Sequence, residues 1–301
     1  MPHTLTRKFR VRYYECDAHG YLKDANYLRY MQETAFDASA AAGFDFERYT
    51  EMKRLWLVRE TGINFIHPLL YNDVVEVKTW VADFRRVSSR RAYEFYRTSA
   101  GDSTKLKPEQ GQPAAIAYTD WAFIDTSRNR PAIIGKDFIE GFYPEGIPDS
   151  FPTREAFPKA PPPPKDVFTT QIEVAINHID SMQHVNNGVY LDYITECSRQ
   201  VNTFYGWQWD RIEESGFEIL LQQCRIQYVK PAQLGDKLKI STWAFNIKRS
   251  SVERHYLIRR ETNGELLARV HTRYIGINPI TDAPAQIPLD YLNDFAKNIV
   301  M

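Results

Sequence analysis

The stretch DSMQHVNNGVYLDYITE, residues 180–196, decides the fold because an upstream stretch repeats its pattern. The upstream copy is DAHGYLKDANYLRYMQE, residues 17–33. Both stretches begin with Asp, place Tyr ten residues later and place Glu six residues after that. A single offset relates them (180 − 17 = 163), and a repeat of this length predicts two copies of one structural unit.

The offset of 163 holds over about eighty residues without a gap. It pairs Pro68 with Pro231, Thr79-Trp80 with Thr242-Trp243, and Arg91 with Arg254. After the polar insert GDSTKLKPEQGQP (101–113) the offset falls to 153, which pairs Thr119 with Thr272. Because surface loops tolerate insertions at low cost, the insert predicts a longer hairpin loop in the first copy.

A proline-rich segment, FPTREAFPKAPPPPKD at 151–166, separates the copies. Proline does not continue a helix or a central strand, so this composition favours a semi-rigid extended connector. The predicted organisation is an N-terminal domain at 1–150, the linker at 151–166 and a C-terminal domain at 167–301.

Each copy has the same predicted order of elements. A short strand (9–14 or 171–176) leads into a loop that carries the Asp, and a helix begins at about Asn26 or Gly188. Tyr27, Tyr30, Met31, Thr34 and Ala35 give the first helix an apolar face at helical spacing.

Strands rich in Val, Ile, Tyr, Trp and Thr follow each helix, at 73–84, 90–99, 116–125, 236–247, 253–261 and 267–277. A helix followed by antiparallel strands predicts an α+β unit with the helix on one face of a curled sheet. Since such a sheet has an exposed edge that an equal copy can cover, we expect an internal pseudo-dimer with a ligand cleft between the halves.

Composition and charge exclude several classes of protein. Lys plus Arg and Asp plus Glu each total 38, so the chain has no global positive field for nucleic acid or anionic membrane. No apolar run approaches the roughly 20 residues that span a bilayer, and the first residues lack the apolar core of a signal peptide. We therefore expect a cytoplasmic protein. Three cysteines without CxxC spacing predict reduced thiols rather than disulfides or a zinc site.

One of the two repeated stretches resembles the signature of a known family. DSMQHVNNGVY resembles the Asp-x-x-x-His-Val-Asn-Asn-x-x-Tyr signature of hot-dog-fold thioesterases. Two such halves in one chain are similar to the acyl-acyl-carrier-protein (acyl-ACP) thioesterases of plants and bacteria. The resemblance implies a tandem hot-dog fold, each half a curled antiparallel sheet around a central helix. It also implies a hydrolase that releases free fatty acid from acyl-ACP, without metal or cofactor, and an apolar acyl tunnel beside the central helices.

Thioester hydrolysis needs a base or nucleophile and donors for the developing oxyanion. Asp180, just before a helix, is the leading candidate for the first role, and the N–H groups at the helix start suit the second. His184 is a candidate to polarise the carbonyl or shuttle a proton. The structural alternatives are a turn or cap carboxylate for Asp180 and a hydrogen-bonded loop histidine for His184.

The second copy departs from the plant pattern at two positions. Met182 stands where those enzymes usually have Asn, and Gln223-Cys224 stands where they have Glu-Cys. Gln223 cannot act as a base. Asn186, Asn187 and Gln223 remain candidates to position water.

The first copy supplies a second set of candidates. Asp17 aligns with the Asp of single-domain acyl-CoA enzymes, with His19 two residues later and Glu60 at the position equivalent to Gln223. The structural alternative for Asp17 is again a turn carboxylate. Arginines in FRRVSSRR (84–91) and IKRSSVER (247–254) are candidates to receive an acidic carrier protein or coenzyme A phosphates, or else to line a solvated sheet edge.

Three other functions stay open on the sequence. The same chemistry could act on acyl-coenzyme A (acyl-CoA). A hot-dog dehydratase would use His with Glu or Asp, although the HVNN block argues against it. A non-catalytic acyl-thioester-binding protein would account for Met182 and Gln223. Whether the chain pairs into a homodimer is also open.

Overall fold

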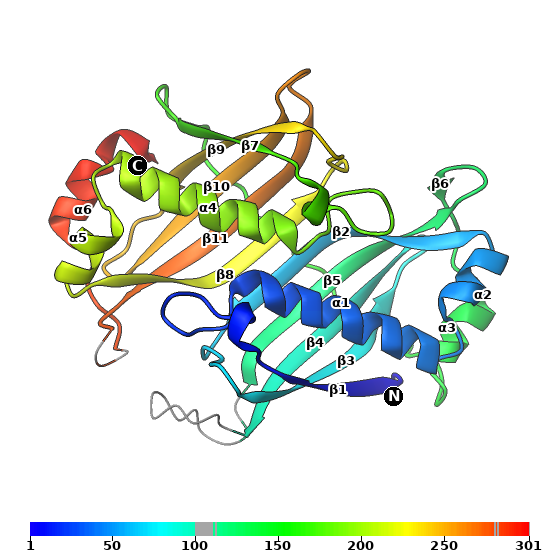
Figure 1. Cartoon of the computed structure of the whole chain (residues 1–301). Helices are drawn as coiled ribbons and strands as arrows, with labels where there is room; N and C mark the ends of the chain where they lie inside the picture. The colour runs from blue at the N-terminus through cyan, green and yellow to red at the C-terminus, as the bar shows by residue number, and fades with distance from the viewer. Residues whose placement is uncertain (100–110, 112, 280, 282, 301) are drawn as a thin grey trace. The chain divides into compact units, whose positions relative to one another are not determined.

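Each half of the repeat folds into an antiparallel sheet with one long helix along its face (Figure 1). The computed structural model describes residues 1–99, 111, 113–279, 281 and 283–300, so most of the predicted insert at 101–113 lies outside the described residues. The first unit comprises Met1–Ala156 and the second Phe157–Met301. Their boundary falls within the proline-rich segment 151–166, which contains no helix or strand.

The first unit has the strand order β1-β3-β4-β5-β2, with neighbours antiparallel and the short β6 paired to β5. Its elements are β1 (Thr4–Arg10), the 3-10 helix η1 (Tyr13–Glu15), α1 (Asp24–Ala41), α2 (Phe46–Glu51), β2 (Arg54–Phe65), β3 (Val74–Phe84), β4 (Ser88–Ser99), β5 (Pro113–Asp125), β6 (Arg130–Pro131) and α3 (Lys136–Phe142).

The second unit has the strand order β8-β11-β10-β9, and both β7 and β12 pair with β9. Its elements are β7 (Phe168–Glu173), the 3-10 helix η2 (Ile176–His178), α4 (Val189–Phe204), α5 (Trp209–Glu214), β8 (Glu218–Tyr228), β9 (Lys237–Phe245), β10 (Ser251–Arg260), β11 (Leu266–Ile277), α6 (Leu289–Asp294), η3 (Ala296–Asn298) and β12 (Ile299–Val300).

The two sheets repeat one topology, since β1, β3, β4, β5 and β2 correspond in order to β7, β9, β10, β11 and β8. Strand register follows the two sequence offsets. Ala92 pairs with Tyr118 in the first unit, and His255 pairs with His271 in the second, as offsets of 163 and 153 require. The predicted α+β tandem hot-dog fold is confirmed.

The central helices bury the faces that their apolar spacing predicts. Tyr27, Tyr30, Met31, Thr34 and Ala35 are all buried on α1. Burial of each large side chain stabilises the fold by about 1.5–3 kcal/mol, which holds the helix to the sheet. Helix α1 begins two residues before the predicted start and α4 one residue after it.

The predicted first strands at 9–14 and 171–176 were wrong in their bounds. Strand β1 ends at Arg10 and β7 at Glu173, and a 3-10 helix follows each of them. The aromatic pair Tyr13-Tyr14 suggested a strand but lies exposed in η1. The chain turns there because the Glu15 carboxylate accepts a hydrogen bond from the Arg12 N–H at 2.8 Å.

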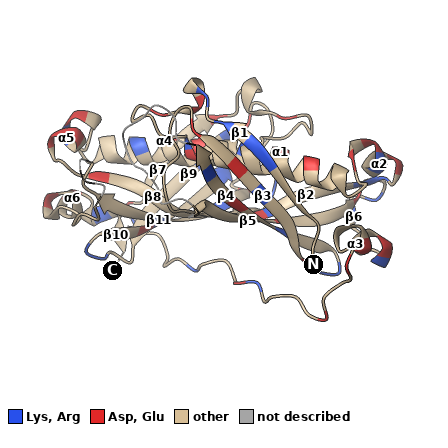
Figure 2. Cartoon of the chain, turned by 90° about the horizontal axis from the view of Figure 1, so that it is seen from below, with Lys and Arg blue, Asp and Glu red and all other residues tan. Residues whose placement is uncertain are grey.

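Residues of both charge signs are interspersed along the ribbon, in keeping with a net charge of zero (Figure 2). No helix among the described residues is long and apolar enough to cross a membrane. The proline-rich segment is fastened at both ends, since Arg154 pairs with Asp83 in the first unit and Trp243 Nε1 donates to the Pro161 carbonyl at 3.1 Å in the second.

Candidate active site

The loop before each central helix is closed by its aspartate. Asp180 Oδ1 accepts a hydrogen bond from the Met182 N–H at 2.9 Å. Asp17 Oδ1 accepts from the His19 N–H at 2.9 Å and from the Tyr21 N–H at 3.0 Å. This is the Asx-turn geometry that Asp favours. One carboxylate oxygen therefore holds the loop in both copies, as the structural alternative predicts, and only the second oxygen is left for chemistry.

The second carboxylate oxygen of the aspartate has different surroundings in the two copies. Asp180 Oδ2 accepts from Asn186 Nδ2 at 3.3 Å, while Asn186 Oδ1 accepts the Gly188 N–H at 3.0 Å. Because the N–H can only donate to the amide oxygen, the Asn186 amide is fixed with its NH₂ group toward Asp180. The residue at the Asn186 position in the first copy is Lys23, which is exposed.

Burial also distinguishes the two aspartates. Asp180 is half-buried, whereas Asp17 and His19 are exposed. A carboxylate that is partly shielded and aligned by a neighbouring amide is better placed to orient a water molecule than one in bulk solvent. The geometry therefore favours Asp180 over Asp17 as the reacting carboxylate.

The start of α4 provides donors beside this loop. Asn187 carries no acceptor for its N–H in the described part of the chain, and its carbonyl accepts from Tyr228 Oη at 3.0 Å. Such an N–H at a helix start lies in the positive field of the helix dipole and can hold a developing oxyanion. His184 lies across the same loop, where its carbonyl accepts the Asp180 N–H at 3.0 Å.

Met182 is 42% exposed and takes part in the loop through its backbone N–H. His19 fills the same backbone role in the first copy. The position that lacks the expected Asn is therefore one where the loop needs a backbone donor, which any residue except Pro supplies. The missing amide does not disrupt the loop.

Gln223 and Glu60 each lie directly after a β-bulge. The register of β8 and β11 skips Gln222, and that of β2 and β5 skips Arg59, which are equivalent positions at the offset of 163. Bulges are frequent beside active sites because they re-aim a side chain. Glu60 is buried, and its Oε1 accepts from Tyr118 Oη at 2.6 Å, so it is held by a different element from the Asp17 loop.

His178 and its equivalent in the first copy, Glu15, were not singled out by the sequence analysis. Each is the last residue of the 3-10 helix that precedes the aspartate loop. His178 Nδ1 accepts the Ala175 N–H at 3.0 Å and lies 2.9 Å from Tyr193 Oη. The equivalent Glu15 accepts the Arg12 N–H and Tyr30 Oη at 2.8 and 2.7 Å. Since histidine and glutamate make the same pair of bonds, the role of this position is to hold the turn and the helix, and the copy comparison could have revealed it.

The cysteines lack the environment of a nucleophile. Burial raises the pKa of Cys16 above its ordinary value and that of Cys197 to about 12. Cys224 is buried. Because the thiolate is the reactive form, these surroundings suit small apolar side chains better than a nucleophile. The described residues contain no group of three or more His, Cys, Asp or Glu side chains placed to hold a metal ion.

Two of the arginines proposed to receive an anionic partner are not on the surface. Arg91 is 7% exposed and Arg254 is 5% exposed. Alternation along β4 and β10 turns both side chains into their units, so a role for these two in binding a carrier protein is wrong. Arg86 and Arg249 remain exposed.

Family models match both halves of the chain. Residues 2–142 match the acyl-ACP thioesterase N-terminal domain, and residues 174–298 match the thioesterase-like superfamily. The chain is therefore a tandem of two hot-dog units, each of which is similar to a thioesterase domain.

Individual relatives give the same picture. The chain is 24% identical over 202 residues to the acyl-(acyl-carrier-protein) hydrolase FATB2 of Cuphea viscosissima, covering 64% of this chain and 46% of that protein. It is 28% identical over 110 residues to the long-chain acyl-CoA thioesterase FadM of Escherichia coli K12, covering 36% of this chain and 82% of that protein. The chain thus spans about half the length of the plant relative.

The fold is shared with a solved plant enzyme. The structure of the 12:0-ACP thioesterase from Umbellularia californica matches with a TM-score of 0.69 and 17% identity, over 91% of this chain and 94% of the other. At that identity the match establishes the fold alone.

Proposed function

We propose that this chain hydrolyses fatty acyl thioesters and releases free fatty acid from acyl-ACP, with Asp180 as the catalytic base. The observation that carries the proposal is the half-buried Asp180, whose Oδ2 is aligned by Asn186 beside the start of α4. The match of residues 2–142 to an acyl-ACP thioesterase domain supports carrier protein as the thioester donor.

The proposed reaction is water attack on the thioester carbonyl. Asp180 Oδ2 takes one proton from the water as the new C–O bond forms, and the carbonyl oxygen becomes an oxyanion. The Asn187 N–H stabilises this oxyanion at the positive end of α4. The C–S bond then breaks, and the proton passes to the thiolate, with His184 as the candidate shuttle. The products are a fatty acid and the free thiol of the phosphopantetheine arm.

A second candidate substrate is acyl-CoA, which the similarity to FadM favours. Both substrates present the same thioester and differ in what lies beyond the phosphopantetheine arm. The active-site residues therefore act identically on either one, and the difference lies in recognition of the carrier.

Thiol release from matched acyl-ACP and acyl-CoA of equal chain length tests the proposal. We expect turnover of both, with kcat/KM larger for acyl-ACP. A preference of more than about tenfold for acyl-CoA, equivalent to about 1.4 kcal/mol in transition-state binding, would overturn the choice of carrier. Tight acyl-thioester binding with no thiol release from either substrate would overturn the enzymatic proposal itself.

A further inference from the structure

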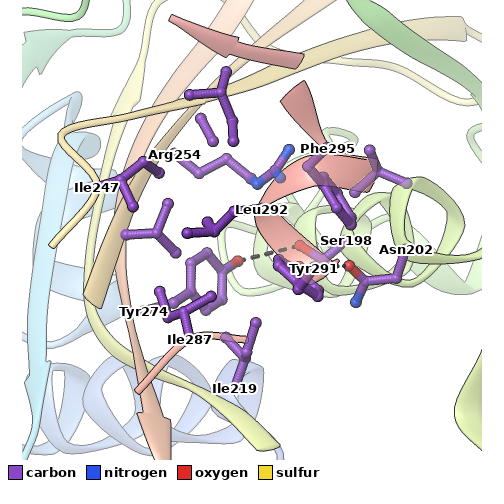
Figure 3. A pocket seen from close by; sticks show the side chains of 14 residues that line it. Ser198, Asn202, Ile219, Ile247, Arg254, Tyr274, Ile287, Tyr291, Leu292 and Phe295 are labelled. Carbon is purple, nitrogen blue, oxygen red and sulfur yellow. Dashed lines mark hydrogen bonds between the residues drawn. The ribbon is translucent and has the colours of Figure 1, made fainter. Parts of the chain in front are cut away.

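The second unit contains a cavity of about 90 Å³ between the later part of α4, the sheet and α6 (Figure 3). Since about 10–15 Å³ on this measure holds one water molecule, the cavity has room for several non-hydrogen atoms. It begins at Ser198, nine residues after the first residue of α4, which is about 14 Å along the helix axis at 1.5 Å per residue. It is thus removed from the Asp180 loop.

The cavity lies where two aromatic rings of the first copy are replaced by smaller side chains in the second. In the first unit Phe138 packs against Phe44, Trp56, Phe84 and Phe123 at ring-centroid distances of 4.1–6.2 Å. The offset of 163 places Ile219 and Ile247 at the positions of Trp56 and Phe84. The position of Phe123 is Gly276, where the ring of Phe217 occupies the space beside the backbone. Ile219 and Ile247 line the cavity.

A buried cation borders this cavity. Arg254 lines it and is 5% exposed. Its Nη1 donates to Asn298 Oδ1 at 2.9 Å and to Thr242 Oγ1 at 3.4 Å, and both acceptors are neutral. Among the described residues no carboxylate lies within 4.0 Å of the guanidinium. Burial of a charge is costly unless an opposite charge or several hydrogen bonds compensate it.

The other groups around Arg254 are neutral as well. Its positive charge acts on the phenols of Tyr256, Tyr274 and Tyr291, and burial raises the pKa of Tyr291 to about 12 and those of the other two above the ordinary value. The phenols therefore stay protonated at neutral pH. Ser198 Oγ joins Tyr256 Oη and Tyr274 Oη at 2.7 and 3.1 Å. The Arg254 guanidinium also lies 5.6 Å from the centroid of the Phe295 ring. Apolar walls, hydroxyl groups and one cation without a carboxylate partner among the described residues complement a small amphipathic anion.

We infer that this cavity binds a short-chain monocarboxylate, with the carboxylate on Arg254 and the alkyl chain against Ile219 and Ile247. Arg254 retains unused N–H donors, since both of its hydrogen bonds leave Nη1, and a guanidinium has five donors in a planar fork suited to a carboxylate. This site goes beyond the proposed function, because binding there requires no hydrolysis.

Calorimetric titration of the full chain with hexanoate and with hexan-1-ol separates charge recognition from filling of an apolar hole. We expect hexanoate to bind at least about tenfold more tightly, since hydrogen bonds to charged groups contribute more than neutral ones. Equal affinity for the acid and the alcohol would overturn the assignment to Arg254. With [1-13C]hexanoate, the carboxyl pKa of the bound acid should lie below that of the free acid.

Matched variants identify the site. Ile247→Phe restores the ring of the first copy and should abolish binding of both probes, whereas Leu234→Phe, at an exposed position, should not. Arg254→Met should lower hexanoate affinity at least about tenfold with little change for hexan-1-ol, while Arg91→Met, at the equivalent buried position in the first unit, should leave both affinities unchanged.

The outcomes that contradict the inference are distinct from failure of the enzymatic proposal. Retention of hexanoate binding in Ile247→Phe, or its loss in Arg91→Met, would place the ligand elsewhere. Asp180→Asn should leave hexanoate affinity unchanged, and a loss of binding in that variant would assign the ligand to the catalytic loop instead. Thermal unfolding of each variant shows whether it is folded during the titration.

Discussion

The two carboxylate oxygens of Asp180 accept hydrogen bonds from different partners. Oδ1 closes the loop through the Met182 N–H, and Oδ2 meets the Asn186 amide. Asn186 in turn accepts the Gly188 N–H, so it links the carboxylate to the start of α4. A base must be held in position to contribute fully, since small misplacements lower the rate strongly. In the proposed mechanism Asn186 is therefore a positioning residue, and its loss should affect turnover more than substrate binding.

Asn186→Ala tests this role at the level of one side chain. We expect kcat for thiol release to fall about tenfold to a hundredfold while KM changes little, because the amide acts on the base rather than the substrate. Stability should fall by about 1 kcal/mol through loss of the bond to the Gly188 N–H. Lys23→Ala, the equivalent change in the first copy, is the control and should leave kcat unchanged. Equal losses in the two variants would contradict the positioning role.

At the scale of the elements, the sequence predicts the central helices and the strands β3, β4, β5, β9, β10 and β11 well, whereas β2 and β8 were not predicted. The apolar spacing of the predicted elements is regular and their burial follows it. The short helices α2, α3, α5 and α6 were not predicted, because helices of six or seven residues carry too few turns for a periodic signal. The first strands were misplaced because capping by Glu15 and His178 was not recognised.

The sequence predicted where the candidate site lies but not the contacts of its individual atoms. The HVNN motif located the Asp180 loop and its Asn186. It could not distinguish which oxygen of Asp180 closes the turn, because that depends on backbone geometry. Nor could the sequence show that Arg91 and Arg254 are buried, since strand alternation alone does not reveal which face of the sheet is covered. Comparison of the two copies would have identified the Glu15 and His178 pair.

The sheet of the second unit contains two neighbouring histidines whose pKa values are lowered by folding. His255 and His271 face each other on β10 and β11, and both Nδ1 atoms are buried without a hydrogen-bond partner in the described structure. Burial, together with the charges of His271 and Arg269, lowers the pKa of His255 to about 4. Burial also lowers the pKa of His271, which Glu253 partly offsets. Folding therefore favours the neutral imidazoles.

The lowered histidine pKa values predict that the folded chain loses stability as the pH falls. The unfolded chain binds a proton at each histidine with a pKa of about 6.5, so it binds more protons than the folded chain below that pH. The contribution of His255 is fully present above about pH 6.5 and is lost as the pH falls toward about 4. Urea midpoints between pH 7.5 and pH 4 should therefore fall less steeply in His255→Phe than in the unmodified chain.

The control for this series is the exposed His19. His19→Gln should keep the full acid dependence of the urea midpoint. An unchanged slope in His255→Phe would show that other groups, such as paired carboxylates, account for the acid sensitivity. The sign is fixed by the direction of the shift: a raised histidine pKa would instead make the chain more stable in acid.

At the scale of the whole chain, the two units share one topology and differ in the residues at equivalent positions. The second unit keeps the Asp180–Asn186 pair and has a cavity lined by Arg254, while the first has Lys23 at the Asn186 position and an aromatic cluster around Phe138. The offset of 163 therefore predicts which residues share a place in the fold. The differences between equivalent residues predict which copy performs the chemistry.

The central claim is that Asp180 and not Asp17 carries out thioester hydrolysis. Its most direct test is the rate of thiol release from acyl-ACP at saturating substrate for Asp180→Ala, Asp17→Ala and the unmodified chain, with circular dichroism to show that each is folded. We predict a loss of at least about a hundredfold for Asp180→Ala, the low end for removal of a general base, and retention of most activity in Asp17→Ala. Abolished turnover in Asp17→Ala with near-normal turnover in Asp180→Ala would contradict this account.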